Sequence, residues 1–213
     1  MNRLITWCVA CSILLIGTVF NATAETDLTS QQLKNWCAKP NQEQRCYLIH
    51  KQLADDGRAE SAYWVGKVTA RGVYQPADLE KAADYYKVAS DSLHPSASRE
   101  LGLLYYHGVY GEREFSKAQK MFEQAMQNGN SEGMWGLARM YHYGRGVEQN
   151  YQKAFELFSL AAEQGSKPAA NTLAYYYRVG LGTEVNPRLA SYWQSKANAK
   201  GLVTWNRSIP DYR

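Results

Sequence analysis

Residues 131–166 read SEGMWGLARMYHYGRGVEQNYQKAFELFSLAAEQGS. The first half of this stretch spaces small and apolar residues three and four positions apart, as on one face of an α-helix. These residues are Met134, Leu137, Ala138 and Tyr141. After a glycine-rich turn, a second helical face follows, made of Ala154, Phe158 and Ala161. The stretch therefore predicts two helices joined by a short turn.

The same pattern recurs along the chain at a shift of 36 residues. Glycine fills one column, at Gly72, Gly108, Gly144 and Gly180, and alanine fills another, at Ala82, Ala118, Ala154 and Ala190. Four glycines in one column are not expected by chance, because glycine makes up only about 7% of average sequences. We expect the glycines to end each first helix with a positive φ, and the alanines to let paired helices approach closely.

The helix starts carry their own signals. Asn186 followed by Pro187 is typical of an N-cap with proline in the first turn, and Ser131 and Ser166 are expected to cap the first helices that follow them. One repeat departs from the pattern, because Leu93 stands where the other units close with glycine.

The chain begins with Arg3 and an apolar run that ends in Ala22-Thr23-Ala24. This order predicts a signal peptide over residues 1–24, cleaved on export, with an uncleaved membrane anchor as the alternative. With 45% hydrophobic and 21% charged residues, the composition excludes wholesale disorder and a multispan membrane protein. The net charge of +4 is too mild to suggest a nucleic-acid-binding protein.

Two cysteines, Cys37 and Cys46, lie outside this leader. An even pair in an exported chain favours a disulfide, with free thiols as the alternative and a zinc site disfavoured. Residues 25–58 are predicted to form a degenerate capping repeat that this bond staples. Residues 203–213 form a tail, either a strap over the last hairpin or a disordered end.

The repeats resemble the Sel1-like repeat family, a relative of the tetratricopeptide repeats. The third unit carries the match, in residues 137–147 (LARMYHYGRGV), 153–154 (KA) and 161–165 (AAEQG). The resemblance implies an all-α fold, a right-handed α-solenoid of helix-turn-helix repeats with a 36-residue period. The four units are expected at residues 59–94, 95–130, 131–166 and 167–202.

In tetratricopeptide-like solenoids the first helices line a concave groove, and the resemblance transfers that role to the positions that flank the packing columns of the first helices. The expected groove residues are Tyr63, Lys67, Arg71, Arg99, Tyr106, His107, Trp135, Arg139, His142, Tyr143, Tyr175 and Arg178. Aromatic and cationic residues are enriched in binding hot spots. Glu60 and Glu132 are expected to be the only acids on this face. Arg99, Trp135 and Arg139 are expected to form one contiguous patch.

The sequence and the resemblance together favour a non-catalytic protein-interaction module in the periplasm or outside the cell. Its partner would be a protein with an acidic or extended segment, held for envelope assembly or neutralised as a secreted effector. The alternatives are a cell-wall hydrolase or β-lactamase-like enzyme, and a peptidoglycan- or glycan-binding module. The histidines show no metal-ligand spacing and no Ser-x-x-Lys motif occurs, so we expect no metal, cofactor or catalytic residue, no nucleic-acid partner and no membrane span after processing.

Overall fold

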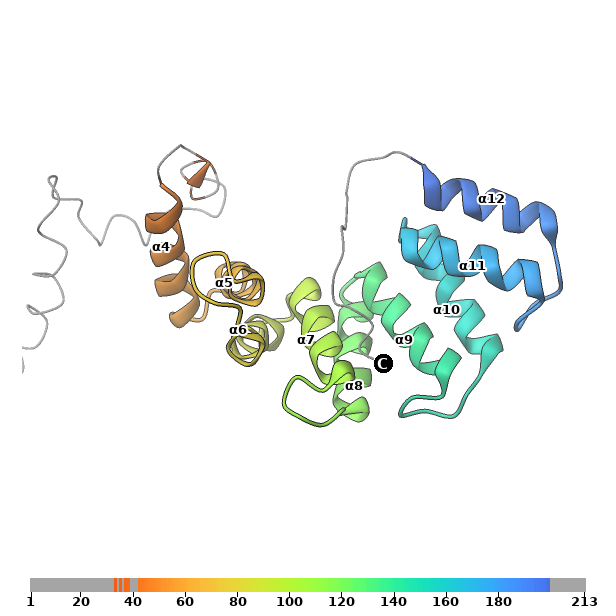
Figure 1. Cartoon of the computed structure of the whole chain (residues 1–213), viewed down its shortest axis with the longest axis horizontal. Coiled ribbons are helices and arrows are strands. Elements are labelled where there is room, and N and C mark those ends of the chain that lie inside the picture. The colour runs from red at the N-terminus through yellow and green to blue at the C-terminus, as the bar shows by residue number, and fades with distance from the viewer. Residues whose placement is uncertain (1–32, 34, 36, 39–41, 200–213) are drawn as a thin grey trace, which may run out of the picture. The chain divides into compact units, whose positions relative to one another are not determined.

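The computed structural model describes residues 33, 35, 37, 38 and 42–199. In this part of the chain the regular structure is entirely α-helical (Figure 1). The chain divides into two units, Met1–Ile49 and His50–Arg213. The predicted leader and the predicted tail both lie outside the described residues. Among the helices described, none is long and apolar enough to cross a membrane.

Nine helices are described, labelled α4 to α12 as in Figure 1. Helix α4 spans Glu43–Asp55, and four hairpins follow it. The hairpins are α5 (Ala59–Arg71) with α6 (Leu79–Asp91), α7 (Pro95–His107) with α8 (Phe115–Gln127), α9 (Ser131–Tyr143) with α10 (Tyr151–Glu163), and α11 (Lys167–Val179) with α12 (Pro187–Asn198). The first helices begin 36 residues apart, as predicted.

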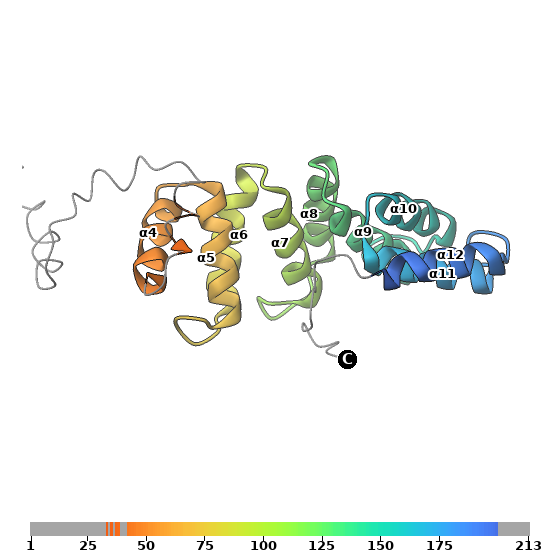
Figure 2. The same cartoon turned by 90° about the horizontal axis from the view of Figure 1, so that it is seen from above.

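Helices α5 to α12 pack in chain order within the second unit. The two helices of each hairpin contact each other, and each second helix contacts the first helix of the next hairpin. Figures 1 and 2 show the hairpins following one another through this unit. This nearest-neighbour packing confirms the predicted all-α solenoid.

Glycine ends every first helix, as its sequence column predicts. Gly72, Gly108, Gly144 and Gly180 all adopt the left-handed conformation, with φ between 65° and 81°. An L-residue with a side chain clashes with its own backbone in this region. The predicted positive φ is therefore confirmed, and glycine adopts it without the steric cost that a side chain would add.

The alanine column lies in the core between paired helices. Ala82, Ala118 and Ala154 are fully buried and Ala190 is 5% exposed. Aromatic rings fill the remaining space, and the ring of Phe122 lies close to two glycines of neighbouring first helices. A Cβ added at Gly102 or Gly136 would come within 2.8 Å of that ring, so these positions accept no larger residue without a shift.

The predicted helix caps are right in two places and wrong in one. Asn186 caps α12 and Ser166 caps α11, each accepting a hydrogen bond from a backbone N–H three residues on. Ser131 does not cap α9, because it is already the first helical residue. Asn130 takes the role instead and accepts a hydrogen bond of 2.9 Å from the backbone N–H of Gly133.

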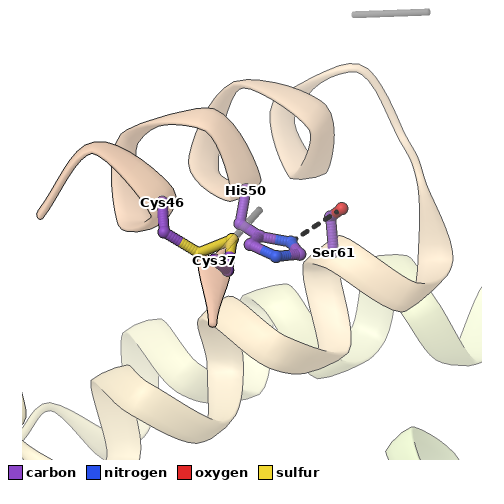
Figure 3. The surroundings of a disulfide bond; sticks show 4 residues. All are labelled: Cys37, Cys46, His50 and Ser61. Atoms are coloured by element: carbon purple, nitrogen blue, oxygen red, sulfur yellow. Dashed lines mark hydrogen bonds between the residues drawn. A yellow bond between two sulfur atoms is a disulfide. The ribbon is translucent and has the colours of Figure 1, made fainter. Parts of the chain in front are cut away.

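In the first unit, Cys37 and Cys46 are joined by a disulfide, with their Cα atoms 5.5 Å apart (Figure 3). Cys46 is buried in the first half of α4. Helix α4 lies within residues 25–58, the predicted capping repeat. Most of residues 25–41 of that repeat lie outside the part of the chain that the structure describes.

Candidate functional site

The twelve predicted groove residues all lie on the first helices of the repeats. Seven are partly buried: Tyr63, Lys67, Arg99, His107, Trp135, Arg139 and His142. Four are exposed: Arg71, Tyr143, Tyr175 and Arg178. We call these eleven residues the groove face. Tyr106 is the exception.

Tyr106 belongs to the core and not to the groove face. Only 2% of it is exposed, and it packs in a cluster with Ala118, Phe122 and Leu137. It lies one helical turn after Gly102, on the side of α7 that packs against neighbouring helices. Its hydroxyl accepts a hydrogen bond of 2.8 Å from Nη1 of Arg145. The prediction that Tyr106 lines the groove is therefore wrong.

Six groove-face residues meet around one cavity of about 400 Å³ between α9 and α11. They are Trp135, Arg139, His142, Tyr143, Tyr175 and Arg178. The other lining residues are Phe158, Asn171, Thr172 and Gln194. We call this space the α9–α11 cavity.

Gln194 is a lining residue that the groove prediction missed. It occupies the sequence column of Tyr86, Phe122 and Phe158, where the other second helices carry buried aromatic rings. Its Nε2 donates a hydrogen bond of 3.1 Å to Oδ1 of Asn171. The break in the aromatic column is the sequence signal that could have identified it.

Arg139 lies between two aromatic rings. Its guanidinium carbon is 5.3 Å from the ring centroid of Tyr106 and 4.7 Å from that of Trp135. Cation–π contacts at these distances hold the cation in place. The indole Nε1 of Trp135 is buried without a hydrogen-bond partner, an arrangement that typically costs about 1–3 kcal/mol.

His142 links two first helices across the edge of the cavity. Its Nδ1 lies 2.6 Å from the hydroxyl oxygen of Tyr176 on α11. Burial, with a smaller contribution from the charge of Arg139, lowers the pKa of His142. Burial also raises the pKa of the Tyr176 phenol.

A second cluster of charges lies between the first two repeats, and it holds an acid that the prediction missed. Oε1 of Glu100 is 2.9 Å from Nη2 of Arg99. Burial raises the pKa of Glu100, while Arg99, Lys67 and Arg71 act in the opposite direction. Glu60 and Glu132 are therefore not the only acids near this face. The adjacent opposite charges of Arg99 and Glu100 were the available signal.

The predicted contiguous patch of Arg99, Trp135 and Arg139 is correct only in its second half. Arg139 stacks on Trp135, and both residues line the α9–α11 cavity. Arg99 does not line that cavity and pairs with Glu100 instead. His107 faces a different cavity of about 700 Å³, which it shares with Thr69, Leu104 and residues 75–80.

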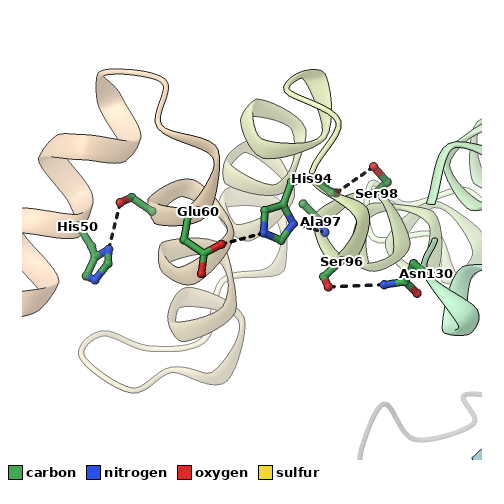
Figure 4. Close-up of polar contacts among 8 residues, drawn as sticks. His50, Glu60, His94, Ser96, Ala97, Ser98 and Asn130 are labelled. Atoms are coloured by element: carbon green, nitrogen blue, oxygen red, sulfur yellow. Dashed lines mark hydrogen bonds and ion pairs between the residues drawn. The ribbon is translucent and has the colours of Figure 1, made fainter. Parts of the chain in front are cut away.

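The starts of consecutive first helices are joined by polar contacts, and Figure 4 shows those between α5 and α7 and between α7 and α9. His94 Nε2 lies 3.3 Å from Glu60 Oε2, and Asn130 Nδ2 lies 3.5 Å from Ser96 Oγ. Ser166 Oγ donates a hydrogen bond of 2.8 Å to a Glu132 oxygen. In each case an N-cap residue reaches back 34 residues. Glu60 and Glu132 therefore serve contacts between repeats.

Comparison with known proteins agrees with this architecture. The Sel1 repeat model matches residues 59–92, 95–130, 131–166 and 167–202. A Sel1 repeat protein from Oxalobacter formigenes is 20% identical, with a TM-score of 0.76 over 84% of this chain and 73% of its own. A Pseudomonas aeruginosa protein, PA5086, is 21% identical, with a TM-score of 0.54 over 85% of this chain and 72% of its own.

A third solved structure is c5321, described as a protective antigen of uropathogenic Escherichia coli strains with an SLR fold. It is 29% identical, with a TM-score of 0.65 over 71% of this chain, but the match spans only 32% of the antigen. No curated protein matches the chain. The four consecutive repeat matches cover most of the sequence, and the chain belongs to the Sel1 repeat family.

Proposed function

We propose that this chain is a non-catalytic interaction module of the cell envelope that binds a partner protein on its groove face. The Sel1 repeat fold is a protein-interaction scaffold, and this supports a protein partner. The observation that carries the proposal is the α9–α11 cavity, where aromatic and cationic residues from two neighbouring repeats come together. The partner is an envelope assembly component or a secreted effector that the module neutralises.

The exposed residues of this cavity have the character of a binding surface. Tyr143 and Tyr175 are 52% and 48% exposed, so partner contacts would bury large parts of both rings. Tyrosine and arginine are among the residues that contribute most to protein interfaces. The exported location of the proposal is supported by the leader-like sequence before Glu25 and by the disulfide of Cys37 with Cys46.

The two alternatives have less support. A hydrolase needs a positioned nucleophile or an acid–base pair, and no Asp, Glu or Cys lines the described α9–α11 cavity. His142 there is bonded to the Tyr176 hydroxyl. A glycan-binding module would stack sugars on Trp135, but the Arg139 guanidinium lies over that ring. The aromatic and cationic side chains of the cavity therefore fit a protein partner better than a sugar or a hydrolase substrate.

Site-specific photo-crosslinking in the native host tests the proposal. A photoreactive phenylalanine analogue at Tyr175 should give a discrete crosslinked protein product. The same analogue at Leu160, which is 43% exposed on the second helix α10, is the matched control and should give none. A product from Leu160 alone, or none from either position, would reject the groove face as the binding surface.

A further inference from the structure

The α9–α11 cavity presents positive charge that none of its lining residues balances. Arg139 and Arg178 both line it, and its described lining contains no aspartate or glutamate. Neither guanidinium makes a hydrogen bond or an ion pair with a described residue. Elsewhere on the groove face the situation differs, since Glu100 pairs with Arg99. The cavity is therefore the place where the face lacks an anion.

The available hydrogen-bonding groups of Arg139 and Trp135 are donors. The contacts of Arg139 with the rings of Tyr106 and Trp135 use its charge but none of its N–H groups. The Trp135 Nε1–H is buried without an acceptor. Arg178 adds a second, exposed guanidinium. A ligand that accepts hydrogen bonds and carries negative charge satisfies both guanidinium groups.

We propose that the α9–α11 cavity binds the side-chain carboxylate of an aspartate or glutamate in an extended segment of the partner protein, an inference that rests on the proposed function. A carboxylate only accepts hydrogen bonds, and guanidinium groups bind it in two-pronged geometry. The cavity of about 400 Å³ has room for such a side chain and part of its backbone. Tyr143 and Tyr175 then contact the neighbouring residues of the segment.

A side chain suits this cavity better than a chain terminus. Peptide termini are bound in other proteins by nests of free backbone N–H groups. Every lining residue here lies within helices α9 to α12, beyond the first turn, where the backbone N–H groups already bond within the helix. The hydrogen-bond donors of the cavity are therefore side-chain groups, and these can bind the carboxylate of a partner's side chain.

The test follows the indole N–H resonance of Trp135 by NMR in the folded mature chain at constant ionic strength. The probe is N-acetylglutamic acid α-amide, whose side-chain carboxylate is free. A saturable shift with a Kd on the order of 1–10 mM is expected for one such group. N-acetylglutamine amide, the neutral isostere, and N-acetylalanine, which offers a terminal carboxylate, should shift it far less.

Three variants locate the effect. Arg178→Gln removes an exposed cation, and Arg139→Lys keeps the charge but removes the planar donor group. Each should weaken probe binding about 10-fold, as expected for losing a charged hydrogen bond. Arg145→Gln is the matched control, since Arg145 also lies over the Tyr106 ring, at 5.2 Å, but does not line the cavity. Its affinity should stay within about twofold.

The inference is overturned if the Trp135 resonance does not move up to about 50 mM probe, a limit well above the expected Kd. Equal shifts with the glutamine or alanine probe also overturn it. The crosslink at Tyr175 separates the two proposals, because it requires no carboxylate. If the crosslinked protein product still forms in the Arg178→Gln and Arg139→Lys variants, the proposed function stands and the carboxylate site is rejected. Probe binding without any crosslinked protein product would show a carboxylate site in the cavity but reject a protein partner on the groove face.

Discussion

Leu93 occupies a position that glycine holds in the other repeats, and its backbone shows the consequence. Its φ is 61°, while Gly57, Gly129 and Gly165 in the same column have φ between 78° and 90°. Among the described residues it is the one non-glycine with positive φ. Because the side chain is 60% exposed, little packing offsets the strain of this conformation.

Leu93→Gly should therefore stabilise the protein. Relief of the left-handed strain, about 1–2 kcal/mol, outweighs the added freedom of glycine in the unfolded chain, about 0.5–1 kcal/mol. We expect a net gain of about 0.5–1 kcal/mol in the free energy of unfolding, measured by urea denaturation. Leu93→Ala keeps the strain and should change stability by less than about 0.5 kcal/mol. A loss of stability in the glycine variant would contradict this account.

His142 should make stability depend on pH on the acid side. Its folded-state pKa is lowered, so the unfolded chain takes up the proton first as pH falls below the ordinary histidine value of about 6.5. Stability is therefore complete above that pH and decreases as pH falls toward the folded-state pKa. In the protonated imidazole, Nδ1 can only donate in its 2.6 Å contact with the Tyr176 hydroxyl oxygen.

The measurement compares urea unfolding of the wild type and His142→Asn between pH 7.5 and the folded-state pKa of His142, which NMR titration of the imidazole gives directly. The variant should lose part of the pH dependence in that window. Identical slopes would show that His142 titrates equally in the folded and unfolded chains. An unshifted pKa of His142 in the NMR titration would likewise contradict this prediction.

At the scale of the helix, Ser166 does two jobs at the start of α11. Its hydroxyl oxygen accepts a hydrogen bond from the backbone N–H of Ala169, and the hydroxyl donates to Glu132 in the preceding repeat. The residue is 2% exposed, so water does not replace these bonds when the hydroxyl is removed. Ser166→Ala should destabilise the protein by about 1–2 kcal/mol in urea unfolding.

Ser131→Ala is the control for this prediction, because Ser131 lies at the equivalent start of α9 but inside the helix. It should leave stability within about 0.5 kcal/mol of the wild type. Equal effects of the two substitutions would mean that the hydroxyl contacts of Ser166 contribute nothing beyond an ordinary helical serine.

The same pair shows what local sequence can and cannot reveal. A serine before an apolar helical pattern predicts the N-cap only to within one residue. The prediction was therefore right for Ser166, but at α9 it named Ser131 where the N-cap is Asn130. Helices and turns were predictable because each depends on residues a few positions apart, and their period was predictable because the same residues recur 36 positions apart. The positive φ of Gly144 was predictable because glycine recurs at the same position of every repeat.

Across the whole molecule, the contacts between repeats limited the prediction of the site. Tyr106 was expected in the groove because it lies beside the column of His107 and Tyr143, yet it is 2% exposed and packs in the core cluster with Phe122. The sequence carried a signal for Glu100 and for Gln194, but their contacts with Arg99 and Asn171 depend on where the side chains lie in the folded chain. The role of the groove face in binding stays a prediction.

The two units of the chain should also differ in their response to reduction. The disulfide lies in the unit Met1–Ile49, while all four hairpins lie in the unit His50–Arg213. Closing a loop with a sequence separation of 9 removes freedom from the unfolded chain worth about 2.5 kcal/mol. In a solenoid, stability depends on each repeat and its immediate neighbours, so this loss should stay local.

Hydrogen exchange detected by mass spectrometry, with and without reductant, tests this prediction. Amides in the first half of α4 should exchange faster after reduction, and those of α7 to α12 should keep their rates. Cys37→Ser with Cys46→Ser should reproduce the effect without reductant, which controls for reagent artefacts. Faster exchange in α11 and α12 would show instead that the array unfolds as one cooperative body, because loosening at one end would then lower protection at the other.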